Sequence, residues 1–470
     1  MLAGIRGPRG VVLALTAFSL CSTLVLFVFL PYDSAVLSFF RFSTQKTISF
    51  LGQPFRDEQW VFRHADFPVH LETDVALILK TGYGTQERIG AQLDALGPEY
   101  EGSLLVIADF SGDYNHSGRA IPVHNMVAAA VAALPDGAGA STDRVEKYTQ
   151  LTAAIQAGHT SEARQLATAA GWELDALKVG VLLSPLRNDR ETDAGQFIPG
   201  LEISYRKLPR RKWYMMIDDD TYLIKPSMRA LLGHLDPSEI MYVGNAIGDF
   251  KGRFAHGGSA ILLSRAAMEQ LFERSRPVVE QAYVQSWTET WGDRLVATTL
   301  MKIGIYLDER FSHFFNGEQP RITRVLPDRF CSPLVSFHGL AEPGQMADTT
   351  ATFRGRDRPV LWGELWSIYG QPALDVFVKN PIRRGRDHVG AGDEAPDGFG
   401  SVERCIAACE GQPECLAWTW DKASTVCRTS RWFIIGDEPE DKYSGLHVAR
   451  VRQLGDCSGV STGRTAAHGS

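Results

Sequence analysis

The sequence predicts an α/β domain with a largely parallel sheet, followed by a small cysteine-rich module. The first observation behind this prediction is a strand–helix–strand order between residues 74 and 108. The second is the apolar run Trp213–Ile217, which leads directly into three consecutive aspartates at 218–220. The third is that six of the seven cysteines lie at or after Cys331.

The first two strands follow from short apolar runs that end in turn residues. Asp74–Lys80 ends at the turn sequence TGYG, and Leu104–Ala108 ends at Asp109. Gln86–Leu96, between them, suits a helix. This order of strand, helix and strand predicts parallel neighbours in one sheet.

The middle of the chain predicts a helical insertion and then a return to the sheet. Residues 125–178 are alanine-rich and helical in pattern, with a glycine-rich break at 137–140. Val179–Leu183 is a further strand candidate. The basic run RKLPRRK at 206–212 fits a solvated turn better than a phosphate-binding site.

Helices and strands also alternate after the three aspartates. Lys225-Pro226 opens a helix, because proline fits the first helical turn. Residues 241–243 and 260–263 are predicted strands. Leu295–Ile303 is amphipathic and predicts a helix that stops at Gly304.

The N-terminal region predicts a membrane anchor. Val11–Leu30 is a mostly apolar, uncharged stretch of 20 residues, which is long enough to cross a bilayer as a helix. Arg6 and Arg9 precede this stretch and no acidic residue occurs before Asp33, so residues 1–10 are expected to be cytosolic and the rest lumenal. A cleaved signal peptide is the alternative. Residues 31–70 show no clear periodicity and are expected to form a stem.

Composition excludes several classes of function. The chain has 470 residues and a net charge of -7, which gives no basis for nucleic-acid binding. The early turn reads TGYGTQ and not as a glycine-rich dinucleotide motif, so a Rossmann-type cofactor is not expected. Neither a serine nucleophile elbow nor a P-loop occurs. Asn115-His116-Ser117 is a glycosylation sequon. A homodimer is possible, and the sequence leaves this open.

The three aspartates predict a metal site at a sheet edge. Open α/β proteins bind ligands where strands end, and like charges this close repel unless a cation lies between them. Carboxylate oxygens favour Mg²⁺ or Mn²⁺, which commonly hold a diphosphate. The alternative, a solvated acidic turn, is disfavoured by the hydrophobic run that precedes the acids.

The aspartate segment WYMMIDDDTYL resembles the metal-binding segment of Fringe-like β-1,3-glycosyltransferases (glycosyltransferase family 31), which include core 1 galactosyltransferase. The resemblance spans residues 71–345, because further segments follow in the family's order. These segments are YVGN at 242–245, FAHGGSAILLSRAAMEQL at 254–271, WGDRLVATTLMKIGI at 291–305 and PLVSFHGL at 333–340.

The resemblance implies a GT-A-like (Rossmann-like) domain over residues 71–385 that transfers sugar from a UDP-sugar to a glycan or glycoprotein. It further implies inversion at the anomeric carbon, a β-1,3 linkage and a single-pass type II protein of the Golgi membrane. Relatives on the same fold that lack the acid triplet provide one alternative, a non-catalytic carbohydrate-binding or chaperone-like protein. A secreted adhesion protein is a second.

The resemblance also assigns roles to individual residues. It implies that Asp220 binds Mn²⁺ or Mg²⁺ directly and that His338 completes the metal site. Asp218 would face the nucleotide sugar or lie behind the direct metal ligands, and Asp219 would contact the nucleotide sugar. Asp293 corresponds to the catalytic base, although the family often has two adjacent acids where this chain has a glycine before the aspartate. Outside the motif, a lone histidine would be a hydrogen-bonded core or surface residue, and an aspartate here would cap the helix.

The remaining site candidates lie in loops. Lys80, Thr81 and Asp109 follow early strands and are predicted nucleotide contacts. The acceptor-side candidates are His256, Gly257 and Gly258, where the glycines allow close approach or a positive φ angle. A simple tight turn and a surface histidine are the alternatives for these three positions.

The cysteine-rich part, placed at residues 386–460 after a linker at 380–400, resembles a PAN/apple domain. Its segment CIAACEGQPECLAWTWDKASTVC predicts a helix and then a strand at LAWTW. Disulfides are expected in a lumenal chain, and the cysteine spacing matches no common zinc site. Residues 461–470 are predicted to be a disordered tail. The resemblance implies the pairs Cys405–Cys427 and Cys409–Cys415, and we add Cys331–Cys457 without a motif.

Overall fold

The structure is a computed structural model, which describes residues 16, 18–19, 29–52, 58–132, 143–169, 197–286, 289, 291–394, 400–437, 439–455 and 457. Most of the predicted anchor Val11–Leu30 lies outside these residues, as do the strand candidate 179–183 and the predicted tail 461–470. Within the described part of the chain, every helix is too short or too polar to span a bilayer.

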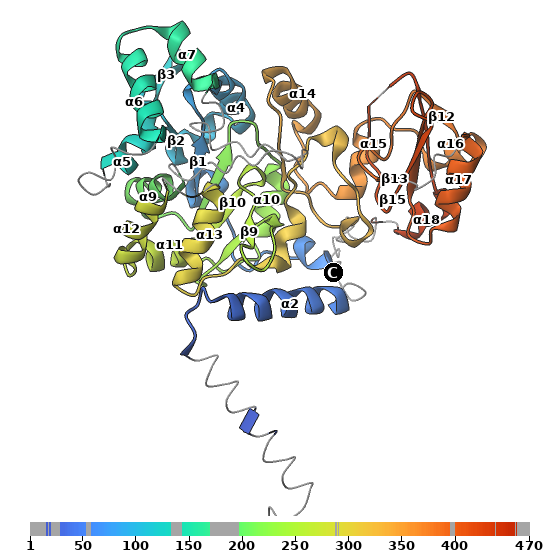
Figure 1. Ribbon diagram of the computed structural model, residues 1–470, viewed down its shortest axis with the longest axis horizontal. Coiled ribbons are helices and arrows are strands. Elements are labelled where there is room, and N and C mark those ends of the chain that lie inside the picture. The colour runs from blue at the N-terminus through green and yellow to red at the C-terminus, as the bar shows by residue number, and fades with distance from the viewer. Residues whose placement is uncertain are drawn as a thin grey trace, which may run out of the picture.

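The central sheet lies in the larger of two units and has the order β3-β4-β2-β1-β5-β10-β7 (Figure 1). The predicted strands appear as β1 (Val75–Lys80), β2 (Leu104–Ala108) and β5 (Trp213–Asp218). These strands run parallel, with β1 between the other two. The α/β prediction is therefore confirmed at the centre of the sheet.

The sheet is mixed, however, and not largely parallel. β10 (Ile261–Ser264) runs antiparallel to both β5 and β7 (Tyr242–Gly244). Residues 245–260 join β7 to β10 without a crossover helix, so the chain returns in the opposite direction. At the other edge, β3 (Gly112–His116) and β4 (Arg119–Asn125) form an antiparallel hairpin that the sequence analysis did not predict.

Helices cover both faces of the sheet, because successive residues of each buried strand point to opposite faces. Along β1, Leu77 packs in one core with α4 (Arg88–Leu96) and α10 (Lys225–Leu232), while Ile78 packs in the other. The helices of the second core are α9 (Phe197–Lys207), α11 (Arg265–Phe272), α12 (Arg276–Gln285) and α13 (Gly292–Lys302).

The predicted insertion is helical where it is described. Its helices are α5 (Met126–Ala132), α6 (Asp143–Gln156) and α7 (Thr160–Ala169). The predicted break at 137–140 lies outside the described residues. α6 and α7 pack against each other around a small core of their own at one end of the molecule (Figure 1).

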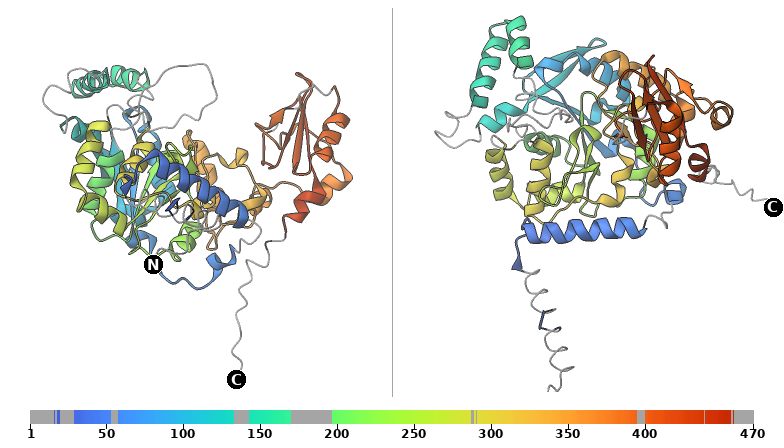
Figure 2. Two further views of the ribbon diagram at one scale, coloured as in Figure 1. Left: turned by 60° about the horizontal axis from the view of Figure 1, so that its bottom comes forward. Right: turned by 45° about the vertical axis from the view of Figure 1, so that its right-hand side comes forward.

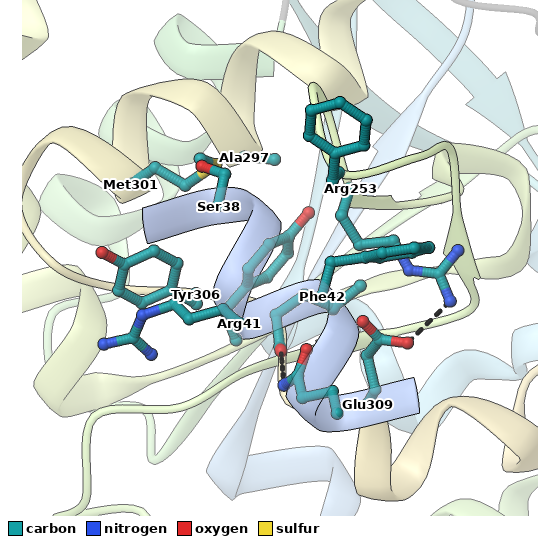
Figure 3. Close-up of a pocket in the computed structure, with 12 residues that line it drawn as sticks. Ser38, Arg41, Phe42, Arg253, Ala297, Met301, Tyr306 and Glu309 are labelled. Carbon is teal, nitrogen blue, oxygen red and sulfur yellow. Dashed lines mark hydrogen bonds and ion pairs between the residues drawn. The ribbon is translucent and has the colours of Figure 1, made fainter. Parts of the chain in front are cut away.

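The predicted stem contains a long helix, α2 (Ala35–Gly52), which packs along one side of the domain (Figures 1 and 2). Arg41 lies over the Tyr306 ring, 3.6 Å from its centroid, and Phe42 packs beside Arg253 (Figure 3). The helical periodicity of residues 35–52 is not recognisable in the sequence, because α2 also carries apolar side chains on its exposed side, such as Phe40.

The C-terminal module is a five-stranded antiparallel sheet with the order β12-β16-β14-β15-β13 and the helix α17 (Val402–Gly411) packed on it. Its strands are β12 (Arg383–Arg384), β13 (Asp393–Glu394), β14 (Ala417–Asp421), β15 (Val426–Ser430) and β16 (Lys442–Leu446). The predicted linker 380–400 therefore supplies two edge strands. The three expected disulfides are present, namely Cys331–Cys457, Cys405–Cys427 and Cys409–Cys415.

Candidate functional site

The three aspartates lie where β5 leaves the central sheet. Asp218 is the last residue of β5 and is in register with Lys80, the last residue of β1. All three carboxylates are buried, with relative exposures of 1%, 1% and 5% for Asp218, Asp219 and Asp220. The alternative of a solvated acidic turn is therefore excluded, and the predicted acidic sheet edge is confirmed.

Asp218 is paired with a buried lysine. Lys80 Nζ lies 2.7 Å from Asp218 Oδ1, and it also lies 4.7 Å from the centre of the Phe197 ring. Burial raises the pKa of the Asp218 carboxyl, Lys80 opposes that rise, and Asp220 adds to it. Lys80 holds the charge of Asp218 inside the protein, and its predicted contact with a nucleotide stays a prediction.

Asp219 is held by the loop that follows β1. The hydroxyls of Thr81 and Thr85 both donate to Asp219 Oδ2 at 2.7 Å. Arg88 is the first residue of α4. Its Nη1 lies 3.4 Å from Asp219 Oδ1 and 3.6 Å from Asp220 Oδ2. Thr85 and Arg88 are not predicted from the sequence, because their only signal is their place just after the first strand's turn.

His338 reaches the aspartates through a short antiparallel pairing. β6 (Tyr222–Leu223) follows the acids and pairs with β11 (Ser336–Phe337), so the next residue, His338, lies at the same edge. Its Nε2 lies 3.3 Å from Asp220 Oδ1 and 3.9 Å from Asp218 Oδ2. Burial alone would lower the pKa of His338, but Asp220 and Asp218 together raise it.

The residues fit a divalent cation. One ligand atom each from Asp218, Asp220 and His338 lies within 4.8 Å of the other two, and all three residues are buried. Asp218 Oδ2 has no hydrogen-bond partner among the described residues, which is unfavourable for a buried carboxylate oxygen without a cation. His338 Nδ1 lies 3.4 Å from the Gly317 carbonyl oxygen, which leaves Nε2 directed at the acids. Oxygen and imidazole nitrogen ligands suit Mn²⁺.

Gly258 allows a close approach, neither glycine has an unusual backbone conformation, and their predicted contact with the acceptor stays a prediction. Neither Gly257 nor Gly258 has a positive φ angle. A Cβ atom on Gly258 would lie 2.2 Å from His338 Nε2, so only glycine leaves room for the imidazole in its place. The Gly258 carbonyl accepts a 2.8 Å hydrogen bond from Thr221, the residue after the acids.

Asp293 lies in the first turn of α13 and not at its N-cap, which is Trp291. Its Oδ2 accepts a hydrogen bond from the Gly257 N–H at 2.9 Å, and its Oδ1 accepts one from the Arg294 N–H at 2.8 Å. Burial raises the pKa of Asp293 to about 6, against the lowering effect of these two N–H groups. Asp293 is therefore a buried carboxyl with a raised pKa, and its assignment as the general base stays a prediction.

Asp293 and His256 line a cleft of about 460 Å³. His256 Nδ1 lies 2.8 Å from the Ser259 hydroxyl, and its ring centre is 5.3 Å from that of His338. Burial lowers the pKa of His256 to about 3, so its imidazole is neutral. The cleft is also lined by Asn245, Ile247, Phe254, Trp291, Phe315, Asn316, Gly317, Glu318, Arg324, Leu326, Arg329 and Trp362.

Asp109 has a structural partner at the neighbouring strand end. It follows β2, which is next to β1, and its Oδ1 accepts a 2.8 Å hydrogen bond from the Tyr83 N–H. Asp109 is buried, and this hydrogen bond fixes the turn after β1, which also carries Thr81 and Thr85. Its predicted contact with a nucleotide stays a prediction.

The fold and the site define an α/β protein with an Asp–Asp–His cluster beside a cleft that holds a buried carboxyl. Comparison with known proteins narrows this class. Residues 191–292 match the family model described as Fringe-like, a region that contains the acid triplet and both glycines. The match confirms, over residues 191–292, the resemblance found in the sequence.

One curated relative is the human chondroitin sulfate glucuronyltransferase. It is 39% identical over 64 residues, an alignment that covers 13% of this chain and 8% of the relative. The chain therefore matches a small part of that protein's length. The similarity of the C-terminal module to PAN/apple domains stays a prediction.

Proposed function

We propose that this protein is a metal-dependent inverting glycosyltransferase that moves a sugar from a UDP-sugar to a glycan or glycoprotein hydroxyl. The buried cluster of Asp218, Asp220 and His338, close to a cleft that contains Asp293, supports the proposal best. The Fringe-like region and the glucuronyltransferase relative agree with it.

Asp218, Asp220 and His338 would hold the cation. Such an ion supplies Lewis-acid stabilisation of the diphosphate leaving group. Arg88 is close to Asp219 and Asp220 and keeps some exposure, so its guanidinium adds a second positive charge near the same leaving group.

The reaction needs a base for the acceptor. In the proposed step, the Asp293 carboxylate takes the proton of an acceptor hydroxyl in the cleft. The hydroxyl oxygen then forms a bond to the anomeric carbon, while the bond from that carbon to the diphosphate oxygen breaks. The electron pair of the broken bond leaves with UDP. Attack on the face opposite the leaving group inverts the anomeric configuration, and the Fringe-like resemblance favours a β-1,3 linkage.

We place the protein in the Golgi lumen, as a type II membrane protein anchored by residues 11–30. Three disulfides support an oxidising compartment for the part of the chain that contains them. The apolar stretch that precedes α2 supports the anchor. The family's properties support the Golgi assignment.

UDP release tests the proposal. The full-length protein in detergent is incubated with single UDP-sugars and a panel of glycan acceptors, with MnCl₂ or with EDTA. If the protein transfers sugar, UDP release should rise when an acceptor is present, stop when EDTA is added and return when Mn²⁺ is added. Linkage analysis of the product then tests the β-1,3 assignment. Metal-independent glycan binding without turnover would instead support the non-catalytic alternative.

A further inference from the structure

One wall of the cleft is formed by a loop of the larger unit, and the C-terminal module contacts this loop. This loop, residues 315–331, is called the cleft loop here. It supplies about half of the residues that line the cleft, and Glu318, Arg324 and Arg329 give this wall its charge. Asp293 and His256 belong to other segments and line the same cleft.

The first half of the cleft loop is held by contacts within the domain. Asn316 Nδ2 donates to the Thr323 hydroxyl and to the Glu318 carbonyl, both at 2.9 Å. The His338 N–H donates to the Glu318 carbonyl at 3.2 Å. Residues 316–318 are therefore fixed next to the metal-capable cluster without help from the module.

The second half is held by the module through its backbone. Val325 and Phe433 form an antiparallel bridge, in which the Val325 N–H donates at 2.9 Å and the Phe433 N–H donates back at 3.3 Å. The Gly436 N–H also donates to the Arg321 carbonyl at 2.8 Å. These bonds join the cleft loop to the segment that follows β15.

Side chains and a disulfide strengthen the same junction. The Arg324 guanidinium lies 5.0 Å from the centre of the Trp432 ring and is paired with Glu318 at 3.2 Å. Cys331, the last residue of the cleft loop, is bonded to Cys457. Trp432 thus fixes the position of an arginine that lines the cleft, although Trp432 itself is not among the lining residues.

We propose that the C-terminal module is part of the acceptor site, because it positions the cleft loop and thereby determines how tightly the acceptor binds. This inference rests on the proposed function. Trp432 and the Cys331–Cys457 disulfide are positioning elements that act through Arg324 and its neighbours. The donor and metal side, built on β1, β5 and β11, contacts the cleft loop where His338 meets residues 317 and 318, which are held within the domain.

Tryptophan substitutions provide the first test. In Trp432→Ala the acceptor KM should rise about two- to fivefold, since a cation–π contact at a partly exposed site contributes about 0.5–1 kcal/mol. The KM for the UDP-sugar should stay at the wild-type value. Trp432→Phe keeps a ring face under Arg324 and should restore most of the acceptor affinity. Trp420→Ala is the matched control, because the Trp420 ring packs at a tilt against Tyr443 inside the module, 5.7 Å between ring centres.

Disulfide variants provide the second test. The double variant Cys331→Ser/Cys457→Ser should raise the acceptor KM by about tenfold, because a small displacement of substrate-positioning groups has large effects. The control Cys409→Ser/Cys415→Ser removes a bond that lies entirely within the module. Acceptor-independent hydrolysis of the UDP-sugar and the melting temperature report whether each variant is folded.

The outcomes separate the two proposals. An unchanged acceptor KM in both Trp432→Ala and the Cys331/Cys457 variant, with hydrolysis of the UDP-sugar intact, would overturn the role of the module and leave the proposed function standing. Equal effects of Trp432→Ala and Trp420→Ala would overturn it too. Absence of any Mn²⁺-dependent UDP release from the wild-type protein would overturn the proposed function itself.

Discussion

The three adjacent aspartates have different partners and therefore different tasks. Asp218 pairs with Lys80, Asp219 accepts hydrogen bonds from two threonines, and Asp220 lies beside His338 and Arg88. Only the first and the third belong to the metal-capable cluster. Asp219 instead ties the loop after β1 to the end of β5, which keeps the other two carboxylates in place.

Loss of Asp220 should remove the response to metal without unfolding the protein. Wild-type protein should be stabilised by Mn²⁺, by about 2.7 kcal/mol at a hundredfold excess over the dissociation constant. Asp220→Ala should show no such rise in melting temperature when MnCl₂ is added. Asp113→Ala, at an exposed position on β3, is the control that should retain it. A full metal response in Asp220→Ala would rule out this ligand.

Activity should depend on the protonation of Asp293. Its pKa is raised to about 6, and a general base must be deprotonated, so kcat/KM should fall about tenfold per pH unit below pH 6. Asp293→Asn should lower kcat/KM by at least about 100-fold and flatten this limb. The profile is measured at saturating Mn²⁺. An acid limb that survives in Asp293→Asn would assign it to another group.

At the residue scale, sequence motifs predicted the metal-ligand candidates Asp220 and His338, but not the residues that hold the aspartates in place. Asp220, His338 and Asp293 could be found because each follows a recognisable run of residues. Thr85 and Arg88 could not, because threonine and arginine after a turn occur in many surface loops. Their role depends on the register of β1 with β5, which only the folded sheet supplies.

At the scale of elements, the site depends on how closely two short segments approach. Gly258 lies in a 3₁₀ turn, and His338 follows β11, yet a Cβ atom on Gly258 would overlap the imidazole. The strand order that brings these segments together was not predictable from periodicity. β6 and β11 have two residues each, too few for a periodic signal.

Gly258→Ala should therefore displace His338 and weaken metal binding. We expect the affinity for Mn²⁺ to fall by about 10- to 100-fold, as for changes that misorient a ligand. Gly102→Ala is the matched control, since no atom lies within 4 Å of a Cβ built there. Isothermal titration with MnCl₂ measures both variants. Equal affinities in the two would show that the imidazole is not displaced or does not bind the ion.

The β3–β4 hairpin presents the glycosylation sequon. Asn115 is exposed near the turn at Ser117-Gly118, where both residues have positive φ angles. In protein expressed through a secretory pathway, we expect one N-glycan at Asn115. Digestion with an amidase that removes N-glycans should lower the mass of the wild type but not that of Asn115→Gln. Identical masses before and after digestion of the wild type would contradict both the modification and a lumenal hairpin.

At the scale of the whole molecule, the predicted succession of stem, catalytic domain, linker and module becomes a set of packed parts. α2 lies along the domain, and the predicted linker contributes strands to the module's sheet. One hydrophobic core contains residues from both units, such as Phe337 and Phe433. Composition indicated the separate units, but local composition carries no information on contacts between distant segments.

The Cys331–Cys457 bond also has a consequence for biosynthesis, because its two sulfurs are 126 residues apart. Translation at about 5–20 residues per second separates them by roughly 6–25 seconds. During that interval the nascent chain carries Cys331 without its bonding partner, Cys457. Formation of this disulfide must therefore wait for Cys457, and a ribosome that stops short of it releases a chain whose Cys331 is open to mispairing.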